Sequence, residues 1–175
     1  MLHHYSLIVL IILLPLLSQA QKKKQQVIQS IEAKADTYRE AALNIWNYAE
    51  LGYQEIRSTA TLQRLLKDEG FSIESGVADI PTAFVATYGS GEPVIGIMGE
   101  FDALPGLSQA AVPERQTLVE GAAGHACGHH LFGVASAAAA IGMKEWLEDN
   151  KEVGTVRFYG TPAEEGGAGK VYMVR

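Results

Sequence analysis

The chain has 175 residues, with 20 acidic and 14 basic side chains, a formal net charge of −6 and one cysteine. The acidic balance gives no support to nucleic-acid binding through a basic surface, and a lone cysteine cannot form an internal disulfide. With 47% apolar and 19% charged residues, the composition is typical of a protein that buries a core. The length suggests one domain of ordinary size.

The first 20 residues contain no Lys, Arg, Asp or Glu. An apolar run from Leu7 to Leu17 precedes Ser18 and Ala20, the small residues expected at −3 and −1 of a cleavage site. This pattern predicts a signal peptide over residues 1–20 and export, either periplasmic or secreted. A membrane anchor is the alternative, but the run has eleven residues, whereas a span needs about 20. We therefore expect no stable membrane span once the leader is removed.

After the leader, the spacing of apolar residues predicts helices that alternate with strands. Helices are expected over residues 27–49, 58–70, 127–148 and 168–175, and strands over 71–75, 83–88, 94–98 and 153–159. Ser58 is the expected N-cap of the second helix. Residues 100–124 show no periodicity and are expected to form a long loop, a kind of segment that is often functional. This order predicts an α/β fold in which helices sandwich a mixed, mostly parallel sheet.

The three histidines that follow the leader are His125, His129 and His130, which lie within six residues around Cys127. Thiolate and imidazole are ligands that zinc and similar ions prefer, and Gly128 allows a tight turn between them. Two alternatives stay open. The cluster could be a chance grouping with a buried cysteine, or Cys127 could be a nucleophile with a histidine base.

A second group of chemically active residues follows the strand predicted over 153–159. Glu164 and Glu165 are adjacent carboxylates, so one can bind a metal while the other acts as a general base; the alternative is a solvated acidic pair. Asp102 follows the strand predicted over 94–98 and could bridge metals or orient a ligand histidine, or simply stabilise its own turn. The spacing assigns no role to Glu50 or Glu55, which are expected to flank an ordinary helix end.

Several of these segments together resemble the M20 metallopeptidase family in its amidohydrolase branch, and within it the aminobenzoyl-glutamate utilization protein B subgroup. The segments that carry the resemblance are Glu50–Glu55 with Ser58, Pro81–Phe84, Glu100–Gln109, Gly124–His129 and Thr161–Gly169. The resemblance extends over roughly residues 31–175, and two motifs in the expected order make it specific.

The resemblance implies a site for two divalent ions, Zn or Mn, with ligands that include Cys127, His129 and Glu165. It implies that Glu164 is the general base of a hydrolysis in which activated water attacks an amide. The substrate class would be a small N-acyl or N-aryl-acyl amino acid, such as an aminobenzoyl-glutamate-like amide, or a dipeptide. His125 would support the site and Asp102 would lie close to the metals. The role of His130 is open, because the family usually carries Asp or Asn there.

The family takes further histidine ligands from segments beyond the tandem glutamates, where a dimerisation domain is also inserted. Residues 21–175 are therefore expected to be the N-terminal part of a catalytic domain that is truncated here, from a protein that forms a homodimer at full length. The chain alone is expected to be inactive. The alternatives are a fragment that only binds metal or a partner, and a cysteine hydrolase that uses Cys127.

Overall fold

The structure is a computed structural model that describes residues 21–175, so the expected leader lies outside the described residues. A helix over 21–33 is followed by α2 (Ala35–Tyr48), α3 (Ile56–Asp68), β1 (Ser72–Ser75), η1 (Val77–Asp79), β2 (Phe84–Ser90), β3 (Val94–Gly99), α4 (His129–Asn150), β4 (Gly154–Gly160), α5 (Glu164–Gly167) and α6 (Gly169–Met173). Within residues 21–175, no helix is both long and apolar enough to cross a membrane.

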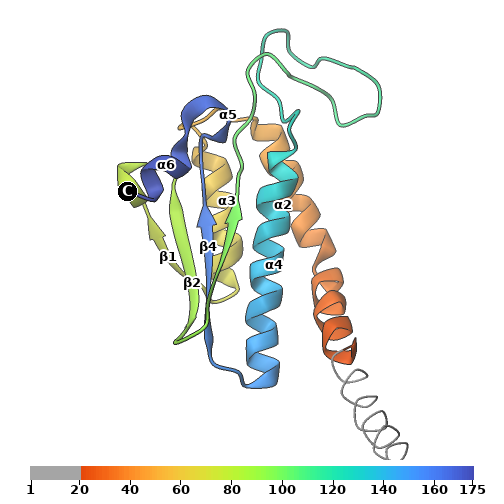
Figure 1. Ribbon diagram of the computed structural model, residues 1–175. Helices are drawn as coiled ribbons and strands as arrows, with labels where there is room; N and C mark the ends of the chain where they lie inside the picture. Colours follow the sequence, from red (N-terminus) through yellow and green to blue (C-terminus); the bar gives the residue numbers. More distant parts are fainter. Residues whose placement is uncertain (1–20) are drawn as a thin grey trace, which may run out of the picture.

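The four strands form one sheet in the order β1-β2-β4-β3 (Figure 1). The expected mixed α/β architecture is confirmed. Parallel pairs do not predominate, however, because only β3 and β4 pair in parallel, while β1–β2 and β2–β4 are antiparallel. The cause is that residues 91–93 join β2 to β3 across the end of β4, where Thr155 N–H donates to the Pro93 carbonyl. The chain thus reverses direction between β2 and β3, and only the β3–α4–β4 crossover returns in parallel.

Helices α3 and α4 pack on one face of the sheet, and α2 packs against both of them (Figure 1). The core between these layers is closed by fully buried side chains that include Leu62, Phe84, Ile141 and Phe158. The opposite face of the sheet exposes Val94 at 44% and Met98 at 52%. The expected cover of helices is thus seen on one face of the described sheet.

Helix α4 approaches the sheet closely because its inner side carries small residues. Ala137 and Ala140 are fully buried, and a Cβ added at Gly133 would lie 2.6 Å from the Glu100 carbonyl oxygen. The helix begins at His129, two residues later than expected. The opposite side is less buried than its apolar character suggests, since Leu131 is 59% exposed.

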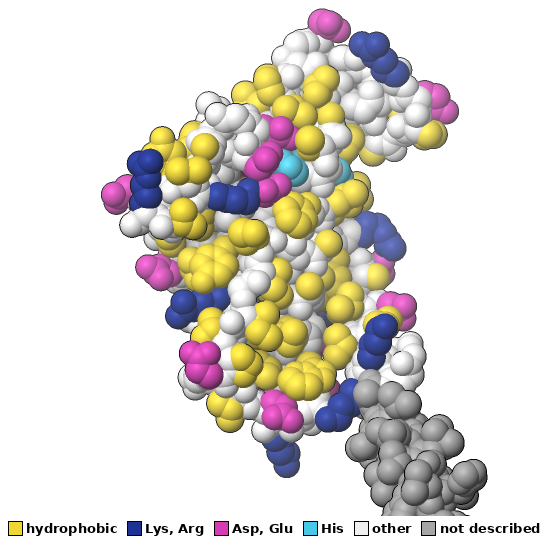
Figure 2. Space-filling model, viewed as in Figure 1, with side chains coloured by type: hydrophobic (Ala, Val, Ile, Leu, Met, Phe, Trp, Pro, Cys, Tyr) yellow, Lys and Arg dark blue, Asp and Glu magenta, His cyan; other side chains and the backbone are white. Residues whose placement is uncertain are grey.

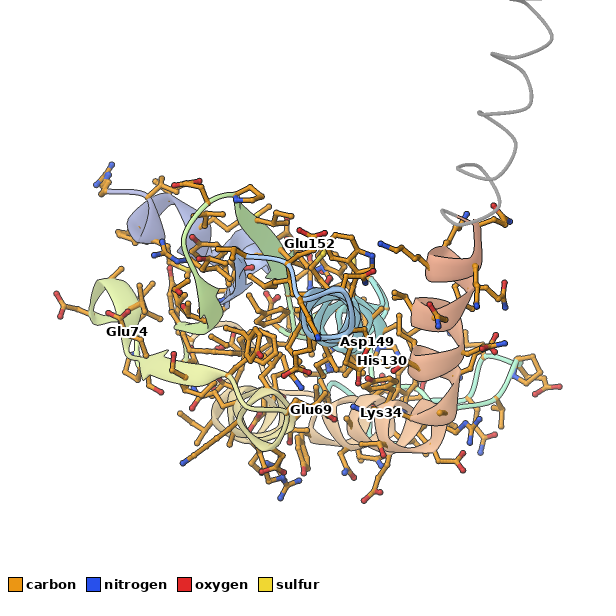
Figure 3. The ribbon with its side chains drawn as sticks, turned by 90° about the horizontal axis from the view of Figure 1, so that it is seen from below. Lys34, Glu69, Glu74, His130, Asp149 and Glu152 are labelled. Atoms are coloured by element: carbon orange, nitrogen blue, oxygen red, sulfur yellow. The ribbon has the colours of Figure 1, made fainter. Side chains whose placement is uncertain are left out.

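The single helix expected over 27–49 is divided by a turn at Lys34. The Lys34 ammonium lies 2.5 Å from Glu69 Oε1 and 2.8 Å from Glu145 Oε1, so it connects the start of α2 to the end of α3 and to α4. Figure 3 shows Lys34 beside Glu69 at this lower end of the molecule. These ion pairs hold α2, α3 and α4 together at the end of the molecule that lies far from the candidate site.

Candidate metal centre

The candidate site lies where two parallel strands end. Because β3 and β4 run in parallel, Glu100, directly after β3, lies beside the segment that follows β4. Helix α4 begins at the same end with His129 (Figure 1). Figure 2 shows acidic side chains gathered around a histidine here, beneath the protruding loop. The carboxyl ends of parallel strands are where sites are built in α/β folds, as the sequence predicted for the tandem glutamates.

Two overlapping groups of potential metal ligands occur in the described part of the chain. In the first, one ligand atom each from Cys127, His129 and Glu165 lies within 4.8 Å of the others. In the second, the same holds for Glu100, His129 and Glu164. The structure therefore brings together the four residues expected at the centre from the sequence and adds Glu100. His129 belongs to both groups.

Asp102 fixes the direction of His129. Its Oδ1 lies 2.9 Å from His129 Nδ1, and its Oδ2 accepts the Glu165 N–H at 2.8 Å. The Asp102 side chain is fully buried, so both contacts are sheltered from water. With Nδ1 held by Asp102, Nε2 points toward the carboxylates, 3.0 Å from Glu100 Oε2. Such a contact on the far nitrogen sets the tautomer and orientation of a metal-binding histidine.

The tandem glutamates differ in environment although they are adjacent. The Glu164 side chain is 43% exposed, whereas Glu165 is largely buried and its Oε1 has no hydrogen-bond partner among the described residues. The pair begins a short distorted helix, α5, which follows Ala163 in the left-handed conformation (φ 56°, ψ 44°). For a residue other than glycine this conformation costs about 1–2 kcal/mol, so the surrounding contacts must hold it.

His125 and His130 point away from the carboxylates. Both rings pack near Trp46 of α2, with 5.1 Å between the two histidine ring centroids and 4.8 Å from His130 to Trp46. Burial lowers the pKa of both histidines, that of His130 to about 4. His129 and His130 diverge because consecutive residues on a helix are about 100° apart. Neither His125 nor His130 belongs to the two ligand groups.

The thiol of Cys127 is exposed and faces negative charge. A contact with the Glu165 carboxylate, together with a little burial and the charges of Glu164 and Asp102, raises the pKa of Cys127. A raised pKa is the opposite of what a nucleophilic cysteine needs. A cation among these groups would remove the conflict between their charges.

Sequence reasoning missed several residues around the site. Glu50, not Ser58, caps α3, because the Glu50 carboxylate accepts the N–H groups of Arg57 and Ser58 and the Ser58 hydroxyl. Glu55 is fully buried and accepts the Ala163 N–H at 2.8 Å. Both glutamates lie at the expected helix end, and no periodicity distinguished them from exposed acidic residues. Glu100 accepts a hydrogen bond from Lys170 of α6, which is 70 positions away in the sequence, and also contacts His129.

The comparisons with known proteins agree with this geometry. The model of "Peptidase family M20/M25/M40" matches residues 96–175. Over 147 residues the chain is 48% identical to a p-aminobenzoyl-glutamate hydrolase subunit of Escherichia coli, an alignment that covers 83% of this chain and 31% of that protein. The chain belongs to the M20 peptidase family.

Two further similar proteins have lower sequence identity. A Xaa-Arg dipeptidase of Mus musculus is 31% identical, with 86% of this chain and 34% of that protein covered. A crystal structure of a dinuclear metal-binding M20 peptidase from Bacillus subtilis superposes with a TM-score of 0.57 at 31% identity, covering 78% of this chain and 38% of that one. The chain therefore spans about a third of the length of the relatives it matches.

Proposed function

We propose that this chain carries the first metal-binding and proton-transfer groups of a metal-dependent amidohydrolase. The observation that carries the proposal is the convergence of Cys127, His129 and Glu165, whose ligand atoms lie within 4.8 Å of one another. They meet at the ends of two parallel strands, beside the exposed carboxylate of Glu164. Thiolate, imidazole and carboxylate are the ligand types that zinc takes in proteins.

The residues present fit a divalent cation. Glu165 Oε1 is buried without a partner in the described part of the chain, which is costly unless a cation or donor meets it. Cys127 and His129 would complete three contacts to the same ion, leaving room for substrate, as catalytic sites require. When bound, the ion supplies Lewis acidity that polarises the amide carbonyl and acidifies water. Thiolate and imidazole favour Zn, whereas the carboxylates also suit Mn, and a second ion would require ligands beyond these residues.

Each protein group then has a defined task. Asp102 holds the Nδ1 proton of His129, so that Nε2 is the nitrogen directed to the ion. Glu164, with Oε2 3.8 Å from His129 Nε2 and its side chain partly open to solvent, accepts the proton of the attacking water and returns it to the leaving amine. His125 and His130 support the start of α4 through Trp46.

The substrate class we propose is a small N-acyl or N-aryl-acyl amino acid, such as an aminobenzoyl-glutamate-like amide, or a dipeptide. The support is the activities for which the relatives are named, a p-aminobenzoyl-glutamate hydrolase and a Xaa-Arg dipeptidase. We further propose two ions in the complete site, a homodimer at full length, and export directed by residues 1–20. Residues 21–175 would form the N-terminal part of the catalytic domain.

Two other functions remain as outcomes of the test. A cysteine hydrolase would depend on the Cys127 thiol and survive chelation, but the raised pKa of that thiol argues against it. A protein that only binds metal or a partner would keep its metal and show no hydrolysis at any length.

The experiment compares Glu164→Gln with the unaltered residue in a protein of the relatives' full length. We expect aminobenzoyl-glutamate or dipeptide hydrolysis that is abolished by chelation and restored by Zn or Mn. Glu164→Gln should lower kcat at least about a hundredfold while the bound metal, measured by elemental analysis, is retained. The 175-residue chain alone should show no hydrolysis. Activity that persists after chelation, or a fully active Glu164→Gln variant, would contradict the proposal.

A further inference from the structure

Beneath the tandem glutamates lies a fully buried carboxylate that the proposed reaction does not use. Glu55 lies just before α3, and its side chain is entirely shielded from solvent. Glutamate is almost never fully buried unless it is paired, yet no ion pair within residues 21–175 includes Glu55. Contacts other than an ion pair must therefore explain why the Glu55 carboxyl group is buried.

A direct hydrogen bond joins Glu55 to the backbone of the segment that carries the tandem glutamates. Its Oε1 accepts the Ala163 N–H at 2.8 Å, across 108 positions of sequence, while Oε2 has no partner in the described part of the chain. The same segment meets Ala163 a second time, because a Cβ at Gly52 would lie 3.0 Å from the Ala163 Cα. The hydroxyl of Tyr53 donates to the Gly167 carbonyl at the other end of α5. Residues 52–55 thus support α5 from below.

Ala163 is the position from which the tandem glutamates are directed. It is buried and left-handed, and its carbonyl accepts N–H groups of Gly167 at 3.1 Å and Gly169 at 3.4 Å. Glu164 follows immediately, and the Glu165 N–H is held by Asp102. Two buried carboxylates, Glu55 and Asp102, therefore fix the backbone on either side of Glu164.

We infer that Glu55 is a positioning residue, which holds Ala163 in its left-handed conformation and thereby sets the directions of Glu164 and Glu165 toward the metal centre. The role of Glu55 in metal binding rests on the proposed function, whereas its hydrogen bond to Ala163 does not depend on a bound ion. Glu55 belongs to neither of the two groups of potential metal ligands. Its carboxylate is needed as a hydrogen-bond acceptor at one point in space, so an amide oxygen at the same point should serve as well.

The test uses three substitutions of the 175-residue chain: Glu55→Gln, which keeps the acceptor; Glu55→Asp, which withdraws it by one methylene; and Glu55→Ala, which removes it. Leu66→Ala is the control for a general loss of stability, since Leu66 is fully buried in α3, near the end of that helix opposite to Glu55. Amide hydrogen exchange at Ala163 and Glu165 is measured without metal. Co(II) affinity is then measured by the thiolate-to-cobalt charge-transfer band that Cys127 should produce.

We expect exchange at Ala163 and Glu165 to be about tenfold faster in Glu55→Ala and Glu55→Asp, and close to the unaltered rate in Glu55→Gln. Co(II) affinity should fall about 10–100-fold in the first two and be rescued in Glu55→Gln. Leu66→Ala should leave both local readouts at their original values. Equal losses in Glu55→Gln and Glu55→Ala, or unchanged exchange in Glu55→Ala, would overturn the inference. If the unaltered chain binds no Co(II), the proposed metal function fails, while the exchange measurements still decide the role of Glu55.

Discussion

Replacing Asp102 by asparagine tests how the candidate site is built. Asp102 is buried and accepts two hydrogen bonds, one from His129 Nδ1–H at 2.9 Å and one from the Glu165 N–H at 2.8 Å. An asparagine of the same shape has one accepting oxygen, so its NH₂ group must face one of these two donors. Either His129 changes tautomer and turns a protonated Nε2 toward the ion, or the Glu165 backbone is released.

The size of the effect follows from these two contacts. Hydrogen bonds to charged groups contribute about 1.5–3 kcal/mol each, so the loss of one should lower the free energy of unfolding by about 2 kcal/mol. Because the affected histidine and glutamate are both proposed ligands, zinc affinity should fall about 10–100-fold. Denaturant unfolding of the metal-free chain and calorimetric zinc titration measure the two quantities separately.

Asp36→Asn is the matched control. The Asp36 side chain is 93% exposed and pairs with Arg39 on the surface of α2, so this variant should change the unfolding free energy by less than about 0.5 kcal/mol and leave zinc affinity unchanged. If Asp102→Asn binds zinc as tightly as the unaltered chain, the proposed coupling of Asp102 to His129 and Glu165 is wrong.

Three further predictions concern the scaffold. Gly133→Ala should lower the free energy of unfolding by about 1–3 kcal/mol in denaturant, because the added Cβ would lie 2.6 Å from the Glu100 carbonyl oxygen. This is the opposite of the stabilisation that replacing glycine by alanine usually gives in a helix. In the control Gly142→Ala the Cβ would meet only side-chain atoms, so the loss of stability should be smaller. Tyr38→Phe should raise the unfolding free energy by about 1 kcal/mol, since the Tyr38 hydroxyl is buried without a partner in the described residues. Burial raises the pKa of Tyr38 to about 12, so the stability of the unaltered chain should fall as pH rises above about 10, and the variant should lack this part of the loss in alkaline melts. Burial lowers the pKa of His130 from its ordinary value of about 6.5 to about 4. The free energy of unfolding should therefore decline as the pH falls below about 6.5, and this contribution should level off below about 4. If His130→Phe shows the same dependence on pH in an acid-unfolding series, this prediction is wrong.

Much of the fold could be predicted because local patterns determine it. The strands over 72–75, 84–90, 94–99 and 154–160 lie within a residue or two of their expected positions, since alternating and apolar runs mark them directly. The strand order could not be read in the same way. Whether β4 lies between β2 and β3 or at the outer edge of β3 depends on contacts distant in sequence. Residues 91–93 pass across the end of β4 instead of forming a hairpin turn between two paired strands.

The residues of the candidate site likewise include some that local sequence predicts and some that it does not. Cys127, His129, Glu164 and Glu165 were recognisable because their residue types and close spacing suit metal chemistry. Glu55 and Glu100 were not, because their roles arise from contacts with Ala163 and His129 that no local spacing encodes. His125 and His130 are close to His129 in sequence, yet their rings pack near Trp46 and neither belongs to the two ligand groups, a separation that sequence spacing does not reveal.

In the proposed centre, Cys127, His129 and Glu165 bind one divalent ion. X-ray absorption of the zinc-loaded chain tests it directly, because a sulfur ligand at about 2.3 Å is distinct from nitrogen and oxygen ligands at about 2.0–2.2 Å. We predict one sulfur ligand in the unaltered chain, its replacement by oxygen or nitrogen in Cys127→Ser, and an unchanged sulfur signal in His130→Phe. A zinc spectrum without sulfur in the unaltered chain would contradict the account.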